Sequence, residues 1–463
     1  MAKTPKANPP LTKRLTTQLV RQLVRLRRPT AAGLMRQGLL KLQAPTRRHR
    51  LDPGLVQMRP QVRAAREERR PVVPRPDPDP PGPPGPSPLL RPFGRGRPVT
   101  PFTLGTMRAL DHPDQMEAVL TAALAVGINH IETAPAYGPA EAFLGQALHR
   151  LAGRDPTARQ RLVITSKLLP GPGLEEGLRQ LRASLDRLGL SGLHNLAVHG
   201  LNTPEQLAWA VQGPGASLLE RAVGEGLVEQ VGFSSHGSTD LIEAALASGR
   251  FSFCNLHLHL FDQERLPLAR AALAAGIGVL AISPADKGGR LYAPPQQLVA
   301  DCQPFEPLRL AYRFLLAQGI TTLSVGAAKP RDLDLAGQLA GATGPLSAAE
   351  RQALARLERA GQERLGAERC GQCRRCLPCP NEVPIPALLR LRNLAVGHGM
   401  EAFASERYSL IGRAGPWWEQ LDASACQTCG DCLPRCPLEL PIPELLADTH
   451  RRLAAPPRRR LWG

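Results

Sequence analysis

Short apolar runs alternate with helix-like stretches along the middle of this 463-residue chain, and this alternation limits the possible fold more than any other feature. The stretches between the runs, such as Gln115–Ala125 and Leu174–Leu188, repeat apolar side chains at helical spacing. Eight strands with intervening helices predict an α/β protein built on a (β/α)8 or TIM barrel, a fold of about 250 residues. The eight candidate strands are Thr103–Thr106, His130–Thr133, Leu162–Ser166, Leu196–His199, Val231–Ser234, Phe253–Leu256, Val279–Ser283 and Thr322–Val325.

A doubly wound open sheet is the rival fold. That fold usually has a glycine-rich phosphate loop directly after its first strand, whereas Met107 and Arg108 follow the first strand here. We therefore expect a barrel over residues 99–345. A polar helix over residues 346–368 is expected to join it to a C-terminal domain at residues 369–455.

The excess positive charge lies in an N-terminal arm, residues 1–98. Residues 1–100 hold 22 of the 58 Lys and Arg but 5 of the 40 Asp and Glu, so the rest of the chain is nearly neutral. Residues 71–88 contain ten prolines, which exclude helix and sheet interiors. We expect a disordered arm. Its Leu11–Arg28 stretch is a candidate amphipathic helix for weak contact with a membrane surface. Aromatic side chains are scarce, which argues against nucleic-acid binding.

Targeting signals are not evident in the sequence. We find no apolar run of about 18 residues, the length of a transmembrane helix. We find no charged start followed by a short apolar stretch and a small-residue cleavage site. These observations predict a cytoplasmic protein without a transmembrane segment.

Four polar residues stand at or just beyond the ends of the second, third and fourth candidate strands: Glu132, Tyr137, Lys167 and His199. In a barrel these ends meet at the C-terminal face, where catalytic side chains gather. A Tyr hydroxyl has an ordinary pKa of about 10, and a neighbouring ammonium favours the phenolate. With a carboxylate to hold the lysine and a histidine to orient an oxygen, this group predicts a proton donor for reduction of a carbonyl by a nicotinamide.

The residues around these positions resemble the aldo/keto reductase family. The signature-like stretch is Gly127–Gly138, continuing through Glu141 to Leu144-Gly145, and Leu181–Leu190 matches the region before the family's active-site histidine. The resemblance covers residues 100–340. It implies that Tyr137 is the general acid, that Lys167 and Glu132 tune it, and that His199 orients the carbonyl of a small-molecule substrate.

The resemblance also implies a site for NADP or NAD, with departures from the family pattern. The family usually has Asp where this chain has Glu132, and Ser-Asn where it has Ser235-His236. The residues that usually bind the NADP 2′-phosphate are replaced by Gly326-Ala327. An aromatic is common after the seventh strand, whereas this chain has Ile282 at the end of that strand. The expected nicotinamide-cofactor contacts are Ser234, Ser235, Asn255, Ser283, Gly326, Lys329 and Arg331.

Eight of the ten cysteines form two runs, C-x2-C-x2-C-x2-C-P and C-x2-C-x2-C-x3-C-P. The second is the bacterial ferredoxin pattern for [4Fe–4S] clusters, in which the fourth cysteine binds the other cluster. The segments that follow each run are similar, which indicates an internal repeat and two clusters. One ligand set is then Cys370, Cys373, Cys376 and Cys436, and the other is Cys426, Cys429, Cys432 and Cys379.

Zinc and disulfides are the alternatives for these cysteines. Tetrahedral zinc needs two C-x2-C pairs and leaves half of each run unexplained, and disulfides need an oxidising compartment. The spacing before Cys379 is one residue shorter than usual, so its role is the least defined. Helical stretches at Ala387–Ala395 and Glu401–Tyr408 resemble helical ferredoxin-type domains.

Together these features predict an aldo/keto reductase-type oxidoreductase that couples nicotinamide-dependent carbonyl reduction, or its reverse, to iron–sulfur clusters. A redox carrier protein is a possible partner. The alternative is a catalytically idle barrel in an electron-transfer or assembly partner.

Overall fold

The computed structural model describes residues 89–285, 290–413 and 419–456. The predicted arm, including its amphipathic stretch, lies outside the described residues up to position 88. The described part begins ten residues before the expected barrel start. Arg91 there pairs with Val99 in an antiparallel bridge and donates hydrogen bonds to the carbonyls of Gly319 and Ile320.

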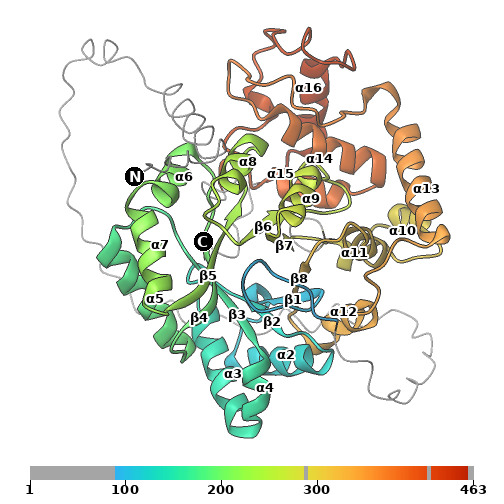
Figure 1. Ribbon diagram of the computed structural model, residues 1–463. Coiled ribbons are helices and arrows are strands. Elements are labelled where there is room, and N and C mark those ends of the chain that lie inside the picture. Colours follow the sequence, from blue (N-terminus) through green and yellow to red (C-terminus); the bar gives the residue numbers. More distant parts are fainter. Residues whose placement is uncertain (1–88, 286–289, 414–418, 457–463) are drawn as a thin grey trace, which may run out of the picture. The chain divides into compact units, whose positions relative to one another are not determined.

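The predicted barrel is confirmed. Eight parallel strands close in sequence order, β1 to β8, with β8 returning to pair with β1 (Figure 1). Each expected strand is present, with ends shifted by a few residues. The strands are β1 (Phe102–Gly105), β2 (His130–Glu132), β3 (Val163–Leu168), β4 (Leu193–Val198), β5 (Val228–Ser235), β6 (Phe253–His257), β7 (Gly278–Ile282) and β8 (Thr322–Gly326).

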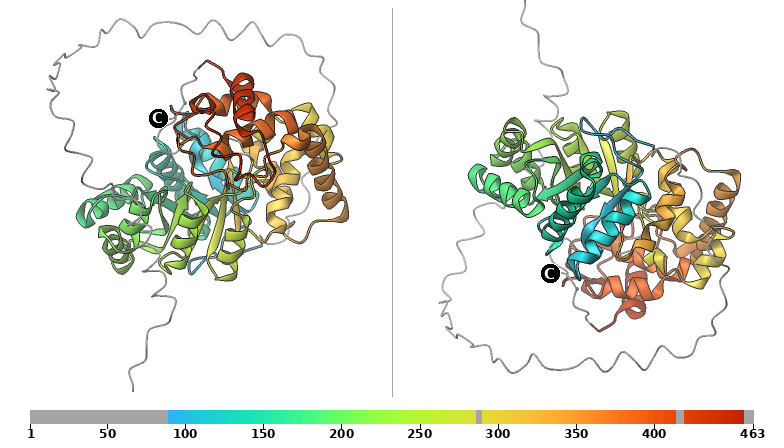
Figure 2. Two further views of the ribbon diagram at one scale, coloured as in Figure 1. Left: turned by 90° about the horizontal axis from the view of Figure 1, so that it is seen from above. Right: turned by 90° about the horizontal axis from the view of Figure 1, so that it is seen from below.

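Helices surround these strands, as the further views in Figure 2 also show. Several begin at a proline, which suits the first turn because its missing N–H has no helical partner there. The barrel's helices are α2 (Pro113–Ala125), α3 (Ala140–Arg154), α4 (Pro156–Arg161), α5 (Leu174–Leu188), α6 (Pro204–Val211), α7 (Pro214–Gly224), α8 (Thr239–Ala247), α9 (Leu266–Ala274), α10 (Gln296–Cys302), α11 (Pro307–Ala317) and α12 (Asp334–Leu339).

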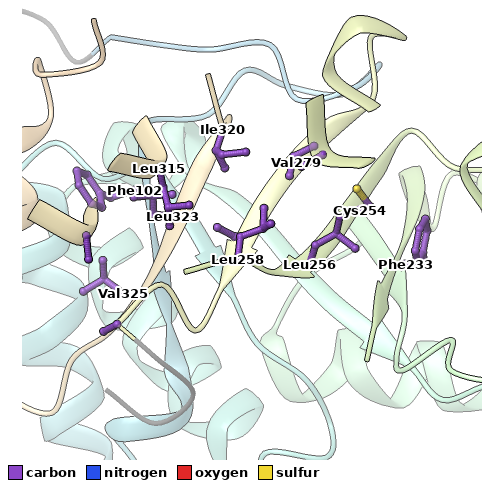
Figure 3. Close-up of a cluster of buried hydrophobic side chains, with 14 of the residues drawn as sticks. Phe102, Phe233, Cys254, Leu256, Leu258, Val279, Leu315, Ile320, Leu323 and Val325 are labelled. Atoms are coloured by element: carbon purple, nitrogen blue, oxygen red, sulfur yellow. The ribbon is translucent and has the colours of Figure 1, made fainter. Parts of the chain in front are cut away.

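The main core lies between the strands and these helices. Alternate residues of a strand point to opposite faces, so Cys254 and Leu256 of β6 point outward while Asn255 points into the barrel. Figure 3 shows these two residues with Val279 of β7, Leu323 of β8 and Leu315 of α11. All five are essentially buried. This apolar layer fixes each strand, and therefore fixes which side chains enter the barrel.

A second, small apolar cluster closes the end of the barrel opposite the strand C-termini. Phe93 is fully buried and packs with Phe253, Val163 and Leu280 from three different strands. The segment before residue 99 therefore contributes to the barrel core, although proline content and charge alone suggested that the arm extends to residue 98.

Above this floor, the barrel interior is polar and internally hydrogen-bonded. His130 is fully buried between Thr103 at 2.8 Å and Thr165 at 2.7 Å. Asn195 donates to Thr165 at 2.9 Å, and Gln230 donates to Asn195 at 2.7 Å. Buried polar groups cost little when they are satisfied in this way. This layer supports the charged side chains one level higher.

The expected connecting helix is α13 (Ala348–Leu365), followed by α14 (Ile385–His398), α15 (Glu401–Tyr408) and α16 (Ile442–Leu453). Among the described residues from 369 onward, the regular secondary structure is helical and includes the expected stretches at Ala387–Ala395 and Glu401–Tyr408. Ion pairs join α13 and α15 to the barrel: Arg364 with Asp301, and Arg290 with Glu406, both at 2.5 Å. Among the described residues, no helix has the length and apolar content needed to cross a membrane.

Candidate active site and cysteine centres

Three of the four predicted catalytic residues meet directly at the C-terminal end of the barrel. Lys167 of β3 forms an ion pair with Glu132 of β2 and donates a hydrogen bond to the Tyr137 hydroxyl at 2.7 Å. It also donates to the Thr133 carbonyl at 3.1 Å. Glu132 and Lys167 are 4% and 3% exposed, so water does not screen their interaction. The longer carboxylate arm of Glu132 thus still reaches the lysine.

Lys167 carries its positive charge in this environment. Burial by itself would lower the pKa of the Lys167 ammonium, but the charges of Glu132 and Tyr137 outweigh burial and raise that pKa. The ammonium lies 4.4 Å from the centre of the Tyr137 ring. A fixed cation beside the phenol oxygen stabilises the phenolate that remains after the tyrosine gives up its proton.

His199 directly follows β4 and completes the predicted group. Its ring meets the Tyr137 ring edge-on, with centroids 5.8 Å apart and an interplanar angle of 89°. Burial, together with the positive charges of Lys167 and His236, lowers the pKa of His199 to about 3. The imidazole is therefore neutral near pH 7 and offers one N–H donor without an additional positive charge.

Other residues of the signature-like stretch have structural roles. Glu141 of α3 is buried and accepts hydrogen bonds from Ser166 at 2.6 Å and from Arg187 at 2.6 and 2.8 Å. Gly145 permits a close helix contact, because a Cβ there would lie 2.1 Å from the Arg187 carbonyl oxygen. These contacts hold α3 and α5 against β3, next to Lys167.

The expected nicotinamide contacts on β5 and β6 lie side by side. Ser234 pairs with Asn255 in the strand register. Asn255 is fully buried, and neither its amide oxygen nor its amide nitrogen has a hydrogen-bond partner among the described residues. The Ser234 hydroxyl accepts from the Gly200 N–H, and the Ser235 hydroxyl donates to the Leu201 carbonyl. The two serine hydroxyls thus bind the loop after β4, while the Asn255 amide is available for a ligand.

The remaining expected contacts lie on β7 and β8. Ser283 follows β7 with a positive φ of 58°. At Gly326, a Cβ would lie 2.9 Å from the Arg108 side chain, so Arg108 from the end of β1 fills the space that a residue with a side chain would take. Lys329 and Arg331 are exposed just beyond β8.

The eight clustered cysteines form two groups. One small cavity is lined by Cys370, Cys373, Cys376 and Cys436, with Leu389 of α14 and Ile442 of α16 among its walls. In the other group, Cys432 lies within electrostatic range of Cys426, Cys429 and Cys379. Cys376 of the first group also lies within electrostatic range of Cys432, so the two groups are neighbours.

The thiols in these groups form no disulfide bonds. None of the ten cysteines is in a disulfide. Burial raises the pKa of the Cys376 thiol to about 11. Burial and neighbouring cysteines also raise the pKa values of the Cys370 and Cys432 thiols. Among the described residues, no three His, Cys, Asp or Glu side chains are grouped as ligands of a single metal ion.

Sequence reasoning missed three basic residues beside the predicted active site. His257 ends β6, two residues after Asn255 and on the same face. Its Nε2 is 3.2 Å from Nε2 of His236, with ring centres 4.2 Å apart. Arg265 donates to the carbonyls of Gly237 and His236 at 3.0 and 3.4 Å. The signal available in the sequence was the two-residue spacing of Asn255 and His257.

Comparisons with known proteins agree with the barrel's geometry. Residues 101–303 match the model of the aldo/keto reductase family. Aldo-keto reductases of Mycobacterium tuberculosis (strain H37Rv) and Mycobacterium ulcerans are 32% and 29% identical over 162 and 167 residues, each covering 34% of this chain and 54% of the relative. The chain thus spans about half the length of these curated relatives.

A solved structure is also similar. An aldo-keto reductase from Bacillus halodurans, in its holo form, is 21% identical, with a TM-score of 0.49 over 58% of this chain and 95% of that one. The family-model match includes Glu132, Tyr137, Lys167 and His199. Residues 101–303, which make up most of the barrel, are therefore similar to the aldo/keto reductase family.

Proposed function

We propose that this protein is a nicotinamide-linked oxidoreductase that reduces a small carbonyl compound, or oxidises the alcohol, and that its C-terminal segment holds two [4Fe–4S] clusters. The observation that carries the proposal is the buried contact of Lys167 with both Glu132 and the Tyr137 hydroxyl. A lysine in that position prepares a tyrosine for proton transfer, and it has no comparable use in an idle barrel.

In the proposed reaction, Tyr137 gives its hydroxyl proton to the carbonyl oxygen as that oxygen becomes an alcohol. Lys167 remains charged and stabilises the resulting phenolate at 2.7 Å. Glu132 holds Lys167 against this oxygen. Neutral His199 donates a hydrogen bond to the same substrate oxygen, which orients the carbonyl toward Tyr137. In the reverse direction the phenolate takes the proton from the alcohol.

The described residues fit a nicotinamide cofactor. Asn255 offers both an amide donor and an amide acceptor inside the barrel, without a partner among the described residues, and this is the complement of a carboxamide group. Ser234 and Ser235 shape the adjacent loop, and Ser283, Gly326, Lys329 and Arg331 would line the remaining length of the cofactor. When bound, a reduced nicotinamide supplies the hydride that the carbonyl carbon receives.

The cysteine groups fit two cubic clusters. Four thiolates around one cube bind four separate irons, so they stand farther apart than the ligands of a single ion. Cys370, Cys373, Cys376 and Cys436 would hold one cluster, and Cys426, Cys429, Cys432 and Cys379 the other. Such clusters supply one-electron transfer, to or from a redox carrier protein.

The test is anaerobic purification with iron and sulfide analysis, followed by titration with NADH and NADPH. We expect brown protein with about eight irons per chain and saturable binding of one nicotinamide. A colourless protein with one or two zinc ions would refute the cluster assignment. Iron-loaded protein that binds no nicotinamide and reduces no aldehyde or ketone would refute the reductase and favour an electron-transfer or assembly protein.

A further inference from the structure

Arg265 is a buried positive charge without an acidic partner. Arg265 directly precedes α9 and is 8% exposed. Among the described residues it forms no ion pair, its Nε has no hydrogen-bond partner, and its Nη2 donates to the carbonyls of Gly237 and His236 at 3.0 and 3.4 Å. Buried charges are normally paired, because removing an ion from water is costly. The charge of the Arg265 guanidinium is therefore not balanced by an anion among the described residues.

The acidic residues of the same loop do not balance this charge. Glu264 faces Arg374 of the first cysteine run, with contacts of 3.3 Å. Asp262 lies 3.9 Å from Arg390 of α14 and 3.9 Å from His259. Both carboxylates thus face cations other than Arg265, and two of those cations belong to the C-terminal segment.

Two histidines beside Arg265 increase the basic character of this position. Arg265 binds the backbone of His236, and His236 and His257 are hydrogen-bonded through their Nε2 atoms. His257 is 6% exposed, whereas His236 is partly exposed. His236 also lies within electrostatic range of His199. The three basic residues thus adjoin the catalytic end of the barrel.

The position of His257 along β6 shows on which side of the proposed cofactor these residues lie. His257 is two residues beyond Asn255 on the same face of β6, so it lies one level nearer the strand C-termini than the proposed carboxamide contact. The residues expected near the cofactor phosphates lie at the end of β8 or just beyond it, and β7 separates β8 from β6. They are Gly326, Lys329 and Arg331. The position therefore belongs to the substrate side of the nicotinamide.

We propose that Arg265, with His236 and His257, is an anion-binding subsite that selects carbonyl substrates carrying a carboxylate. This inference rests on the proposed reductase function and specifies its substrate class. The carboxylate supplies the missing negative charge, and its attachment at this subsite directs the carbonyl carbon of the same molecule toward Tyr137 and His199. Phosphate-bearing carbonyl compounds share the charge and form the comparison class.

The experiment compares the wild-type holoprotein with three variants: Arg265→Gln removes the charge, Arg265→Lys keeps it, and His236→Asn leaves Arg265 in place. Arg270→Gln is the matched control, since Arg270 lies on the same helix and is exposed. The substrates are 4-oxobutanoate and its neutral methyl ester. We expect the wild type to prefer the acid and Arg265→Gln to lose at least about tenfold in kcat/KM for the acid alone, mainly through KM.

We further expect Arg265→Lys to recover part of the preference, His236→Asn to weaken it, and Arg270→Gln to match the wild type. Equal wild-type kcat/KM for acid and ester, or equal losses on both in Arg265→Gln, would overturn the subsite. If Arg265→Gln does not fold, His236→Asn carries the same comparison, with Arg270→Gln again as the control.

A measurement without turnover separates this inference from the proposed function. Calorimetric titration with succinate, and with inorganic phosphate in a parallel arm, tests the subsite even if the protein reduces nothing. Succinate binding that is weakened at least about tenfold by Arg265→Gln, a loss of about 1.4 kcal/mol, supports the assignment. No succinate binding by the wild type, or tighter binding of phosphate than of succinate, overturns it.

Discussion

Cys436 lines the same cavity as Cys370, although Cys436 follows the second cysteine run and Cys370 begins the first. In the other group, Cys379 of the first run is a neighbour of Cys432. The last cysteine of each run thus lies beside cysteines of the other run, as the proposed exchange of ligands requires. The segment between the runs contains α14 and α15, which pack together and bring these distant positions close.

The exchange predicts how paired cysteine substitutions combine. Cys436→Ser and Cys373→Ser belong to one set, so the double variant should keep about four irons, like each single variant. Cys436→Ser with Cys429→Ser affects both sets and should leave little iron. Iron and sulfide analysis of anaerobic preparations measures this. If each run instead kept its own four cysteines, the two double variants would give the reverse result.

Replacing Tyr137 with phenylalanine keeps the ring but removes the transferable proton. A positioned general acid contributes about 10²–10⁴-fold, so kcat should fall by that factor while nicotinamide affinity changes little. Steady-state kinetics with an aldehyde and cofactor titration measure the two effects. A Tyr137→Phe protein that is as active as the wild type on every carbonyl substrate would show that another acid operates or that the barrel is idle.

Acid should destabilise the fold through buried histidines. Burial, with nearby positive charge, lowers the pKa of His130 to about 3, and burial lowers the pKa of His398 to about 4. Both values lie below the unfolded value of about 6.5. The unfolded chain therefore binds more protons between these limits, and stability is lost as pH falls below 6.5.

Each of these histidines contributes up to about 1.4 kcal/mol per pH unit in that window. Denaturant unfolding between pH 7 and pH 4.5 measures the slope. His130→Gln should reduce the slope even though it lowers stability at pH 7, because Thr103 and Thr165 lose a well-placed partner. An unchanged slope would mean that His130 is protonated in the folded protein.

Removal of residues 1–88 should leave folding and iron content unchanged, since nearly all the excess charge and the proline-rich stretch lie there. By contrast, Phe93→Ala should cost about 3–5 kcal/mol, because the ring fills the closed end of the barrel. Thermal unfolding of both proteins provides the comparison. Loss of soluble protein on removal of residues 1–88 would show that the arm contributes to the fold.

The sequence predicted the barrel and the positions of Glu132, Tyr137, Lys167 and His199 because strand periodicity and motif spacing are local signals. It did not predict that Phe93 enters the core, since a single aromatic among prolines has no periodic context. Nor did it predict the contact of His236 with His257 or the isolation of Arg265. The histidine contact depends on the register between β5 and β6. The isolation of Arg265 depends on Asp262 and Glu264 pointing toward other cations. Tertiary packing sets both.

The interlocked cysteine runs have a consequence for how this part of the chain arose and how it can be divided. The cavity of the first run takes Cys436 and Ile442 from the second half, so neither half encloses its own cysteines. Two repeats related in this way behave as one inseparable unit rather than as tandem modules. A polypeptide ending before Cys426 would lack a wall of the first cavity as well as the whole second run. If the repeat began as a single copy, that copy would have needed a second chain to supply the cavity wall that Cys436 and Ile442 provide here.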